Sequence, residues 1–250
     1  MSSLKVALVT GASSGIGAAT VKALVDSGYS VIATARRRDR LEALASTTSG
    51  IEIFPADLTL ASDIDALAEF CADKKVELLV NCAGGAFDAA AVLDGDPAIW
   101  AKTYEVNVIA TLRITQAITP QMISNGKGHI VIVTSTAGHR AYENGGSYVA
   151  AKFAETSLAH TLRLELNGTP IRITEIAPGM VKTEEFAVNR FDGDSAKAAK
   201  VYEGVDAPLT AEDVAESIRW SVTLPEHFNV DSMVIRPVAQ AANHKVHRTS

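Results

Sequence analysis

Seven short runs of β-branched and other apolar residues recur along the chain, and segments with helical periodicity separate them. Strands that alternate with helices in this way are typical of parallel sheets joined by right-handed crossovers. The sequence therefore predicts an α/β fold with a doubly wound, seven-stranded parallel sheet and helices on both faces. The predicted strands span residues 5–9, 30–34, 51–54, 77–81, 129–134, 172–176 and 233–236.

Two helix starts carry recognisable capping signals. Asp96 is followed by Pro97, which is the order of an N-cap and a proline in the first helical position. Thr210 precedes Asp213 by three residues and resembles a capping box. Both positions are expected to begin helices.

The length and composition favour one domain over residues 1–250. A chain of 250 residues that is 47% hydrophobic and 21% charged can build one fully developed core. The net charge of −6 gives no indication of nucleic-acid binding. The longest apolar runs have the length of strands and are far too short to cross a bilayer.

The cysteine content indicates a reducing compartment. Only Cys71 and Cys82 are present, and no cysteine or histidine cluster has metal-ligand spacing. Because the first predicted strand begins at Lys5, we expect no targeting segment before it. The expectation is a cytoplasmic protein that uses no metal.

One segment departs from the alternation. Residues 178–208 follow the sixth predicted strand, carry many charges and show few apolar periods. Ligands of doubly wound sheets bind beyond the carboxyl ends of the strands. We therefore predict a substrate lid at about 179–208, with a plain surface insertion as the alternative.

A glycine-rich turn joins the first predicted strand to the first helix. Gly11 allows a tight turn, Gly15 lets the backbone approach a pyrophosphate, and Gly17 allows close packing of helix on strand. In this position the turn predicts a Rossmann-type dinucleotide site, although a structural glycine turn is the alternative.

The residues after the second predicted strand distinguish between the two nicotinamide cofactors. A site for NAD places a carboxylate there to bind the ribose 2′-hydroxyl. This chain instead has Arg36, Arg37 and Arg38, and a guanidinium can bind a 2′-phosphate with two hydrogen bonds. The sequence therefore predicts NADP(H), with Arg36 as the first contact, Arg37 as the second and Ser13 as a helper.

Tyr148 and Lys152 are one turn apart on a predicted helix and share a face. An ammonium group held there is expected to lower the phenol pKa from its usual value of about 10 toward neutrality. Tyr148 could then donate and accept a proton at cellular pH, while the hydroxyl of Ser135 holds the substrate oxygen.

Taken together, these motifs resemble those of the short-chain dehydrogenases/reductases over essentially the whole chain. The resemblance implies that Tyr148 exchanges the proton, Lys152 lowers its pKa and binds the nicotinamide ribose, and Asn107 holds a water in a proton relay. It also implies contacts of Asp57 and Leu58 with adenine and of Thr183 with the carboxamide. Further cofactor contacts implied are Ser14, Ile16, Asn81, Ala83, Gly84, Pro178, Gly179 and Val181. The family is commonly tetrameric, so a homotetramer is expected.

One position departs from the family pattern. The family usually has a second asparagine after Asn81, where this chain has Cys82. A thiol does not donate hydrogen bonds as an amide does, and Cys82 is expected to be a small buried apolar residue.

The carboxyl-terminal third is similar to the bacterial NADP-dependent 3-hydroxy acid dehydrogenases, on residues 173–194, 208–214 and 236–248. That resemblance implies oxidation of serine, allo-threonine and related 3-hydroxy acids, and reduction of the corresponding 3-oxo acids or semialdehydes. An NADPH-dependent reductase of another carbonyl, such as a 3-oxoacyl thioester or a biosynthetic aldehyde, is the main alternative. A non-catalytic NADP-binding regulator is a second one.

A substrate with a carboxylate favours a cation in or near the lid. Arg190 is the first candidate because its planar guanidinium suits a carboxylate, and a surface ion pair is the alternative reading. Lys182, His139 and Arg140 compete with it. His139, four residues after Ser135, is expected to line the substrate pocket or to lie exposed in a loop.

Overall fold

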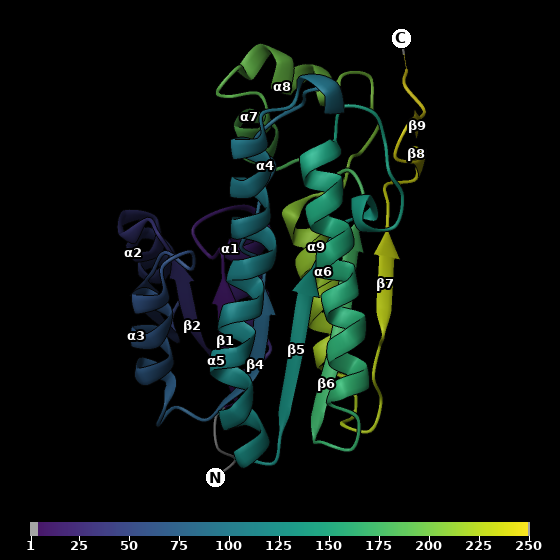
Figure 1. The fold of residues 1–250 in the computed structure, drawn as a ribbon. Coiled ribbons are helices and arrows are strands. Elements are labelled where there is room, and N and C mark those ends of the chain that lie inside the picture. Colours follow the sequence, from purple (N-terminus) through teal and green to yellow (C-terminus); the bar gives the residue numbers. More distant parts are fainter. Residues whose placement is uncertain (1–4, 250) are drawn as a thin grey trace.

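The computed structural model describes residues 5–249 and contains a seven-stranded parallel sheet in the order β3-β2-β1-β4-β5-β6-β7 (Figure 1). All seven predicted strands are confirmed, and no end differs by more than two residues. The strands are β1 (Lys5–Thr10), β2 (Tyr29–Ala35), β3 (Ile51–Pro55), β4 (Val76–Asn81), β5 (Gly128–Val133), β6 (Ile171–Pro178) and β7 (Ser232–Ile235). The strand order reverses between β1 and β4, which is where doubly wound sheets bind their ligands.

Helices cover both faces of the sheet, as the sequence predicts. Helices α1 (Gly15–Asp26), α2 (Arg38–Thr47) and α9 (Ala211–Val222) pack on one face. Helices α3 (Ala61–Cys71), α5 (Ala110–Ser124) and α6 (Gly146–Glu165) pack on the other. Each face therefore has its own apolar core, and the predicted fold class is confirmed.

The two predicted helix starts are also confirmed. Helix α4 (Pro97–Tyr104) begins after Asp96, whose carboxylate accepts a hydrogen bond from Ala98 N at 2.8 Å. Helix α9 begins after Thr210, which exchanges hydrogen bonds with Asp213 in a capping box. A π-helical turn, η2 (Glu105–Ile109), joins α4 to α5 and was not predicted.

The segment 179–208 lies over the carboxyl ends of the strands (Figure 1). It contains two short helices, α7 (Phe186–Arg190) and α8 (Ser195–Tyr202). Its two ends meet in a parallel bridge between Val181 and Leu209. The segment is therefore an excursion that leaves the sheet edge and returns to it.

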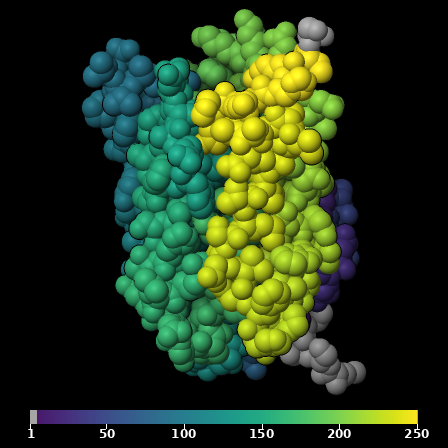
Figure 2. Space-filling model, turned by 90° about the vertical axis from the view of Figure 1, so that its right-hand side faces the viewer, coloured from purple at the N-terminus to yellow at the C-terminus, as the bar shows by residue number. Residues whose placement is uncertain are grey.

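The carboxyl-terminal tail folds onto its own chain. It forms a hairpin of β8 (Gln240–Ala242) and β9 (Lys245–Val246), and Figure 2 shows it in yellow rising to the green segment above. Gln240 Oε1 accepts a hydrogen bond from Met180 N at 2.8 Å, and Thr249 N donates to Gly204 O at 2.7 Å. The tail thus holds segment 179–208 at two places.

Across residues 5–249, every helix is too short or too polar to cross a bilayer. The predicted domain also includes residues 1–4 and 250, which lie outside the described residues, so its limits stay a prediction.

Candidate active site

Two adjoining cavities open at the carboxyl ends of the strands. One has a volume of about 540 Å³ and is lined by Ser135, Tyr148 and Lys152. The other, of about 510 Å³, is lined by the glycine turn and the arginines that follow β2. Ile16 and Gly84 belong to both walls, so the two spaces are neighbours.

The walls contain nearly all of the residues predicted to bind a cofactor. These are Gly11, Ser13, Ser14, Gly15, Ile16, Gly17, Arg36, Arg37, Asp57, Leu58, Ala83, Gly84, Tyr148, Lys152, Pro178, Gly179, Val181 and Thr183. Asn81 lies below the cavities, 2% exposed, and donates to Thr115 Oγ1 at 3.3 Å.

The glycine turn tolerates no side chain at two of its positions. Gly11 has φ of +65°, and a Cβ atom there would lie 2.9 Å from the backbone of Ala83. A Cβ atom on Gly17 would lie 2.3 Å from Gly11 O. Thr10 Oγ1 accepts hydrogen bonds from Cys82 N and Ala83 N at 3.1 and 3.0 Å, which fixes the turn to the end of β4. The start of α1 therefore faces the cavity with bare backbone, as the phosphates of a dinucleotide require.

The arginine turn supplies positive charge at the far end of the second cavity. Arg37 binds Glu185 and donates from Nη2 to Ser13 and Ser14 at 2.9 and 3.1 Å. The hydrogen bond to Arg37 lowers the pKa of Glu185 and, in return, raises that of Arg37. Within residues 5–249, no side-chain hydrogen bond or ion pair engages the guanidinium of Arg36. A cavity with this donor set fits an NADP molecule whose 2′-phosphate lies beside Arg36.

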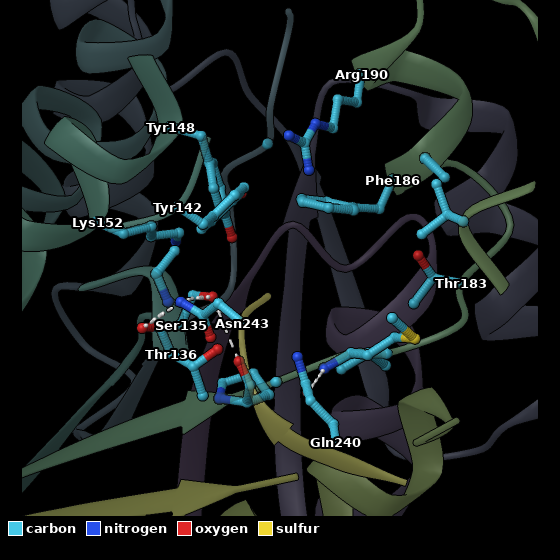
Figure 3. A pocket seen from close by; sticks show the side chains of 18 of the residues that line it. Ser135, Thr136, Tyr142, Tyr148, Lys152, Thr183, Phe186, Arg190, Gln240 and Asn243 are labelled. Carbon is cyan, nitrogen blue, oxygen red and sulfur yellow. Dashed lines mark hydrogen bonds between the residues drawn. The ribbon is translucent and has the colours of Figure 1, made fainter. Parts of the chain in front are cut away.

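The predicted proton-transfer residues meet in the first cavity (Figure 3). Tyr148 and Ser135 are 7% and 8% exposed, and the hydroxyl of Tyr148 points toward Ser135. Lys152 Nζ lies 5.6 Å from the centroid of the Tyr148 ring and donates to Val133 O at 3.1 Å. Phe186 from α7 packs edge-on against Tyr148, with ring centroids 5.4 Å apart. The arrangement places a phenol, a hydroxyl and an ammonium around one space.

The prediction of a lowered phenol pKa is wrong for the protein alone. Burial raises the pKa of Tyr148, and the opposing effects of the Lys152 charge and the Ser135 hydroxyl are smaller. The sequence places the ammonium correctly but does not reveal how completely the phenol is removed from water.

Lys152 has a partner that the sequence analysis missed. Its Nζ lies 2.6 Å from Glu155 Oε2, and Glu155 is 1% exposed. The spacing of three residues on one predicted helix was the available signal, since such residues share a face.

Asn107 is fully buried in η2. Its Nδ2 donates to Thr103 O at 2.7 Å and Gly85 O at 2.9 Å, and its Oδ1 accepts from Gly85 N at 3.1 Å. The π-helical turn aims this amide at the loop after β4. The structure thus places Asn107 as a brace of the cofactor wall, and its role in holding a water stays a prediction.

His139 does not line the cavity. Its Nε2 lies 3.0 Å from Oε1 of Glu175, a fully buried carboxylate in β6 that the sequence analysis did not single out. Glu175 also accepts hydrogen bonds from Thr134, Thr156 and Ser232 at 2.7, 2.7 and 2.8 Å. These contacts hold the loop that carries Ser135 against the sheet.

Arg190 lies in the wall of the first cavity, above Phe186 and beside Tyr142 (Figure 3). Its guanidinium carbon is 5.4 Å from the centroid of the Tyr142 ring, and Nη2 donates to Asn144 O at 2.8 Å. Its Nε is buried without a hydrogen-bond partner among residues 5–249. The side chain therefore keeps unused donors beside the cavity.

Both cysteines are free, and burial raises the pKa of each thiol to about 12. Cys82 packs against the core under β1 and β4. Cys82 is only partly buried, however, and lines both cavities, so the prediction of a small apolar residue agrees with its packing but the predicted burial is incomplete.

Comparisons with known proteins agree with this geometry. Residues 5–192 match the family model of the short chain dehydrogenases. An uncharacterized oxidoreductase of Mycobacterium tuberculosis is 49% identical over 238 residues, which cover 95% of this chain and 93% of the relative. The NADP-dependent 3-hydroxy acid dehydrogenase YdfG of Salmonella typhi is 36% identical over 250 residues, covering 98% of this chain and 100% of the relative. Among solved structures, the closed form of a serine dehydrogenase complexed with NADP+ matches with a TM-score of 0.90 and 34% identity, covering 98% of this chain and 100% of that one.

Proposed function

Because the chain belongs to the short-chain dehydrogenase family and is an NADP-dependent oxidoreductase acting on CH–OH groups, we propose that its substrates are small 3-hydroxy acids. The products of oxidation are the corresponding 3-oxo acids or semialdehydes. The observation that carries this proposal is Arg190, a lid cation with unused donors in the wall of the cavity that contains Tyr148. The resemblance to a 3-hydroxy acid dehydrogenase supports it.

The cofactor site is proposed to be the second cavity. The backbone of the glycine turn would bind the pyrophosphate, and Arg36 would bind the 2′-phosphate. Asp57 and Leu58 would contact the adenine, and Thr183 would contact the carboxamide. The bound nicotinamide supplies the hydride acceptor or donor.

Tyr148 is proposed to take the hydroxyl proton during oxidation and to return it during reduction. Since burial raises the pKa of this phenol, the charge of Lys152 is needed to make the ionised form accessible. Ser135 Oγ would position the same substrate oxygen, and both groups would stabilise charge as it develops there. Replacing Tyr148 by phenylalanine should abolish turnover and leave NADPH binding intact.

Arg190 is proposed to bind the substrate carboxylate. Its guanidinium carbon lies 5.4 Å from the centroid of the Tyr142 ring and 5.9 Å from that of Phe191, and these rings keep water from part of it, which strengthens a charged hydrogen bond. Its carbonyl contact at Asn144 fixes the side chain without neutralising its charge. Because Arg190 and Phe186 are both on α7, segment 179–208 is proposed to act as a lid that closes on the substrate.

The test compares 3-hydroxypropionate with its neutral amide as substrates of the Arg190→Ala variant. Loss of a charged hydrogen bond of about 1.5–3 kcal/mol should raise KM for the acid about 10- to 100-fold and leave KM for the amide nearly unchanged. Lys182→Ala is the matched control, since Lys182 contacts the ring of Tyr202 with its Nζ 6.0 Å from the centroid. Equal effects of Arg190→Ala on both substrates would reject the carboxylate contact, and faster turnover of an acyl thioester than of any free acid would reject the substrate class.

We also propose that the protein is a cytoplasmic homotetramer. Phe153 and Leu164 on α6 are 44% and 79% exposed, which supports association through this helix. Sedimentation velocity of the wild type and of Leu164→Glu tests the assembly, and a wild-type monomer would contradict it.

A further inference from the structure

A second buried charge adjoins the two residues proposed to transfer the proton. Glu155 is 1% exposed and Lys152 is 4% exposed, and their charged atoms lie 2.6 Å apart. Tyr148, Lys152 and Glu155 follow one another at intervals of four and three residues on α6. Such spacing aligns them along one face of the helix, with the ammonium between the phenol and the carboxylate.

We propose that Glu155 is a positioning residue that holds the Lys152 ammonium in place and, through its own charge, sets the pH at which Tyr148 gains or loses its proton. The inference rests on the proposed proton-transfer role of Tyr148 and Lys152.

The first part follows from the way in which Lys152 is held. A buried ammonium without a partner is strongly disfavoured, and its burial lowers its pKa. Burial is opposed by the charge of Glu155, by the ionised form of Tyr148 and by the hydrogen bond to Glu155, which together raise the pKa of Lys152. Val133 O provides a second contact at 3.1 Å on another side of the ammonium. These two contacts keep Lys152 charged and fix the position of its ammonium group.

The second part follows from the sign of the carboxylate. Lys152 lowers the pKa of Tyr148, whereas Glu155, two helical turns from the phenol, raises it. The two side chains therefore act on Tyr148 in opposite directions. An ionised Glu155 cancels part of the field that Lys152 provides.

Tyr142 also raises the pKa of Tyr148, but burial raises the pKa of Tyr142 itself, which keeps that phenol neutral. The other groups on the neighbouring elements do not replace the carboxylate of Glu155. Glu175 on β6 adds negative charge near Glu155, but its own oxygens are occupied by hydroxyls and by His139, which follows the turn η3 (Thr136–Gly138). Cys82 stays a neutral thiol, and Asn107 on η2 is uncharged. Burial raises the pKa of Glu155, and the adjacent ammonium of Lys152 opposes that rise.

The test measures the pH dependence of kcat for Glu155→Gln and Glu155→Asp at saturating NADP+ and 3-hydroxy acid. Glutamine keeps the shape and removes the charge, so the apparent pKa for oxidation should fall by about one unit. That size is expected for a unit charge roughly 10 Å away at an effective dielectric near 20. Aspartate keeps a charge but withdraws it from Lys152, so its apparent pKa should lie between those of the wild type and the glutamine variant.

A spectroscopic measurement without substrate or cofactor gives the same quantity. The near-ultraviolet absorbance of tyrosinate, taken as the difference between each protein and its Tyr148→Phe counterpart, reports the ionisation of Tyr148 directly. It should show the same order of pKa values: wild type highest, aspartate next, glutamine lowest. If the glutamine variant does not fold, the test rests on the decrease in the pKa of Tyr148 from the wild type to the aspartate variant.

Two results would overturn the inference. One is a glutamine variant with an unchanged profile and only a lower melting temperature, because a purely structural residue has that effect. The other is an aspartate variant whose apparent pKa is unchanged or lies below that of glutamine. If the wild type does not oxidise 3-hydroxy acids, the proposed substrate fails separately, and the profiles are measured with the carbonyl compound that the wild type reduces.

Discussion

The guanidinium of Arg37, just after β2, is bound by the carboxylate of Glu185, just before α7, with Nη1–Oε1 and Nη2–Oε2 distances of 2.5 and 2.9 Å. The same guanidinium donates to Ser13 and Ser14 in the glycine turn. One side chain thus joins segment 179–208, the glycine turn and the wall of the second cavity. A 2′-phosphate bound near Arg37 would therefore compete with the carboxylate of Glu185 for the same guanidinium.

Removing the charge of Glu185 should strengthen NADPH binding. In Glu185→Gln the guanidinium of Arg37 becomes available to the phosphate, so Kd for NADPH should fall about 2- to 5-fold, the range of a partly exposed ion pair. Kd for NADH should not change, and fluorescence titration measures both. Glu184→Gln is the matched control, since Glu184 lies 3.5 Å from Arg40 and is more exposed. Weaker NADPH binding in Glu185→Gln would mean that the pair closes over the cofactor instead of competing with it.

Arg36 is expected to determine the preference for NADP. Replacing it by alanine removes a charged hydrogen bond to the 2′-phosphate, worth about 1.5–3 kcal/mol, so KM for NADP+ should rise about 10- to 100-fold. KM for NAD+ should stay within about 2-fold because that cofactor lacks the phosphate. Arg38→Ala is the control, since Arg38 points toward Glu42 on the exposed side of α2. If Arg36→Ala kept its preference for NADP+ over NAD+, Arg37 would be the residue that binds the 2′-phosphate.

Glu175 should make stability depend on pH in the acid range. Burial raises the pKa of this carboxyl, but hydrogen bonds from Thr156, Thr134 and Ser232 lower it further, so the folded-state pKa lies below the ordinary value. The contribution of ionised Glu175 to the free energy of unfolding is therefore fully present above about pH 4.5, and it is lost as the pH falls through the folded-state pKa. Glu175→Gln should lower the free energy of unfolding by about 2 kcal/mol at pH 7 and by less at pH 3.

Urea denaturation at both pH values measures that difference. Glu165→Gln, at the exposed end of α6, serves as the control and should change stability by less than about 0.5 kcal/mol. A loss in Glu175→Gln that is equal at pH 7 and pH 3 would show that shape, and not charge, gives Glu175 its effect.

Gln240 should hold the base of the lid. Its Oε1 accepts the hydrogen bond from Met180 N, and it is 8% exposed. In Gln240→Ala that backbone N–H loses its partner, so limited proteolysis within 179–208 should be faster and KM for the substrate should rise several-fold. Val238→Ala, a fully exposed position in the same tail, should leave both unchanged. Unchanged cleavage in Gln240→Ala would indicate that the lid is held elsewhere.

The sequence predicts the sheet well because its central strands are buried on both faces. Runs such as Gly128–Val133, all of whose residues are buried, consist almost entirely of apolar residues, and only the residues at their two ends are ambiguous. The glycine turn can be predicted equally well, since Gly11 and Gly17 occupy positions where a Cβ atom would collide with the backbone. In both cases sterics or burial restricts which residue types can occupy a position, and this restriction is visible in the local sequence.

Long-range polar pairing cannot be recovered in the same way. Arg37 and Glu185 are separated by 148 positions, and nothing local distinguishes Glu185 from Glu184. The strands of the hairpin β8–β9 have only three and two residues, too few to show a periodicity, and Gln240 in β8 bonds to Met180. The raised pKa of Tyr148 depends on how the lid residue Phe186 and the sheet exclude water, which the spacing to Lys152 does not encode.

The contacts of the tail have a practical consequence for anyone who attaches another protein to this one. Arg248 and Thr249 bond to the backbone at residues 201–204, so a partner fused after the last residue would pull on the cover of the active site. Lys5 begins β1 at the opposite end of the molecule, where the parallel strands start (Figure 1). A tag or a reporter belongs at that end, and kinetic constants measured with a carboxyl-terminal fusion should be compared with those of the cleaved protein.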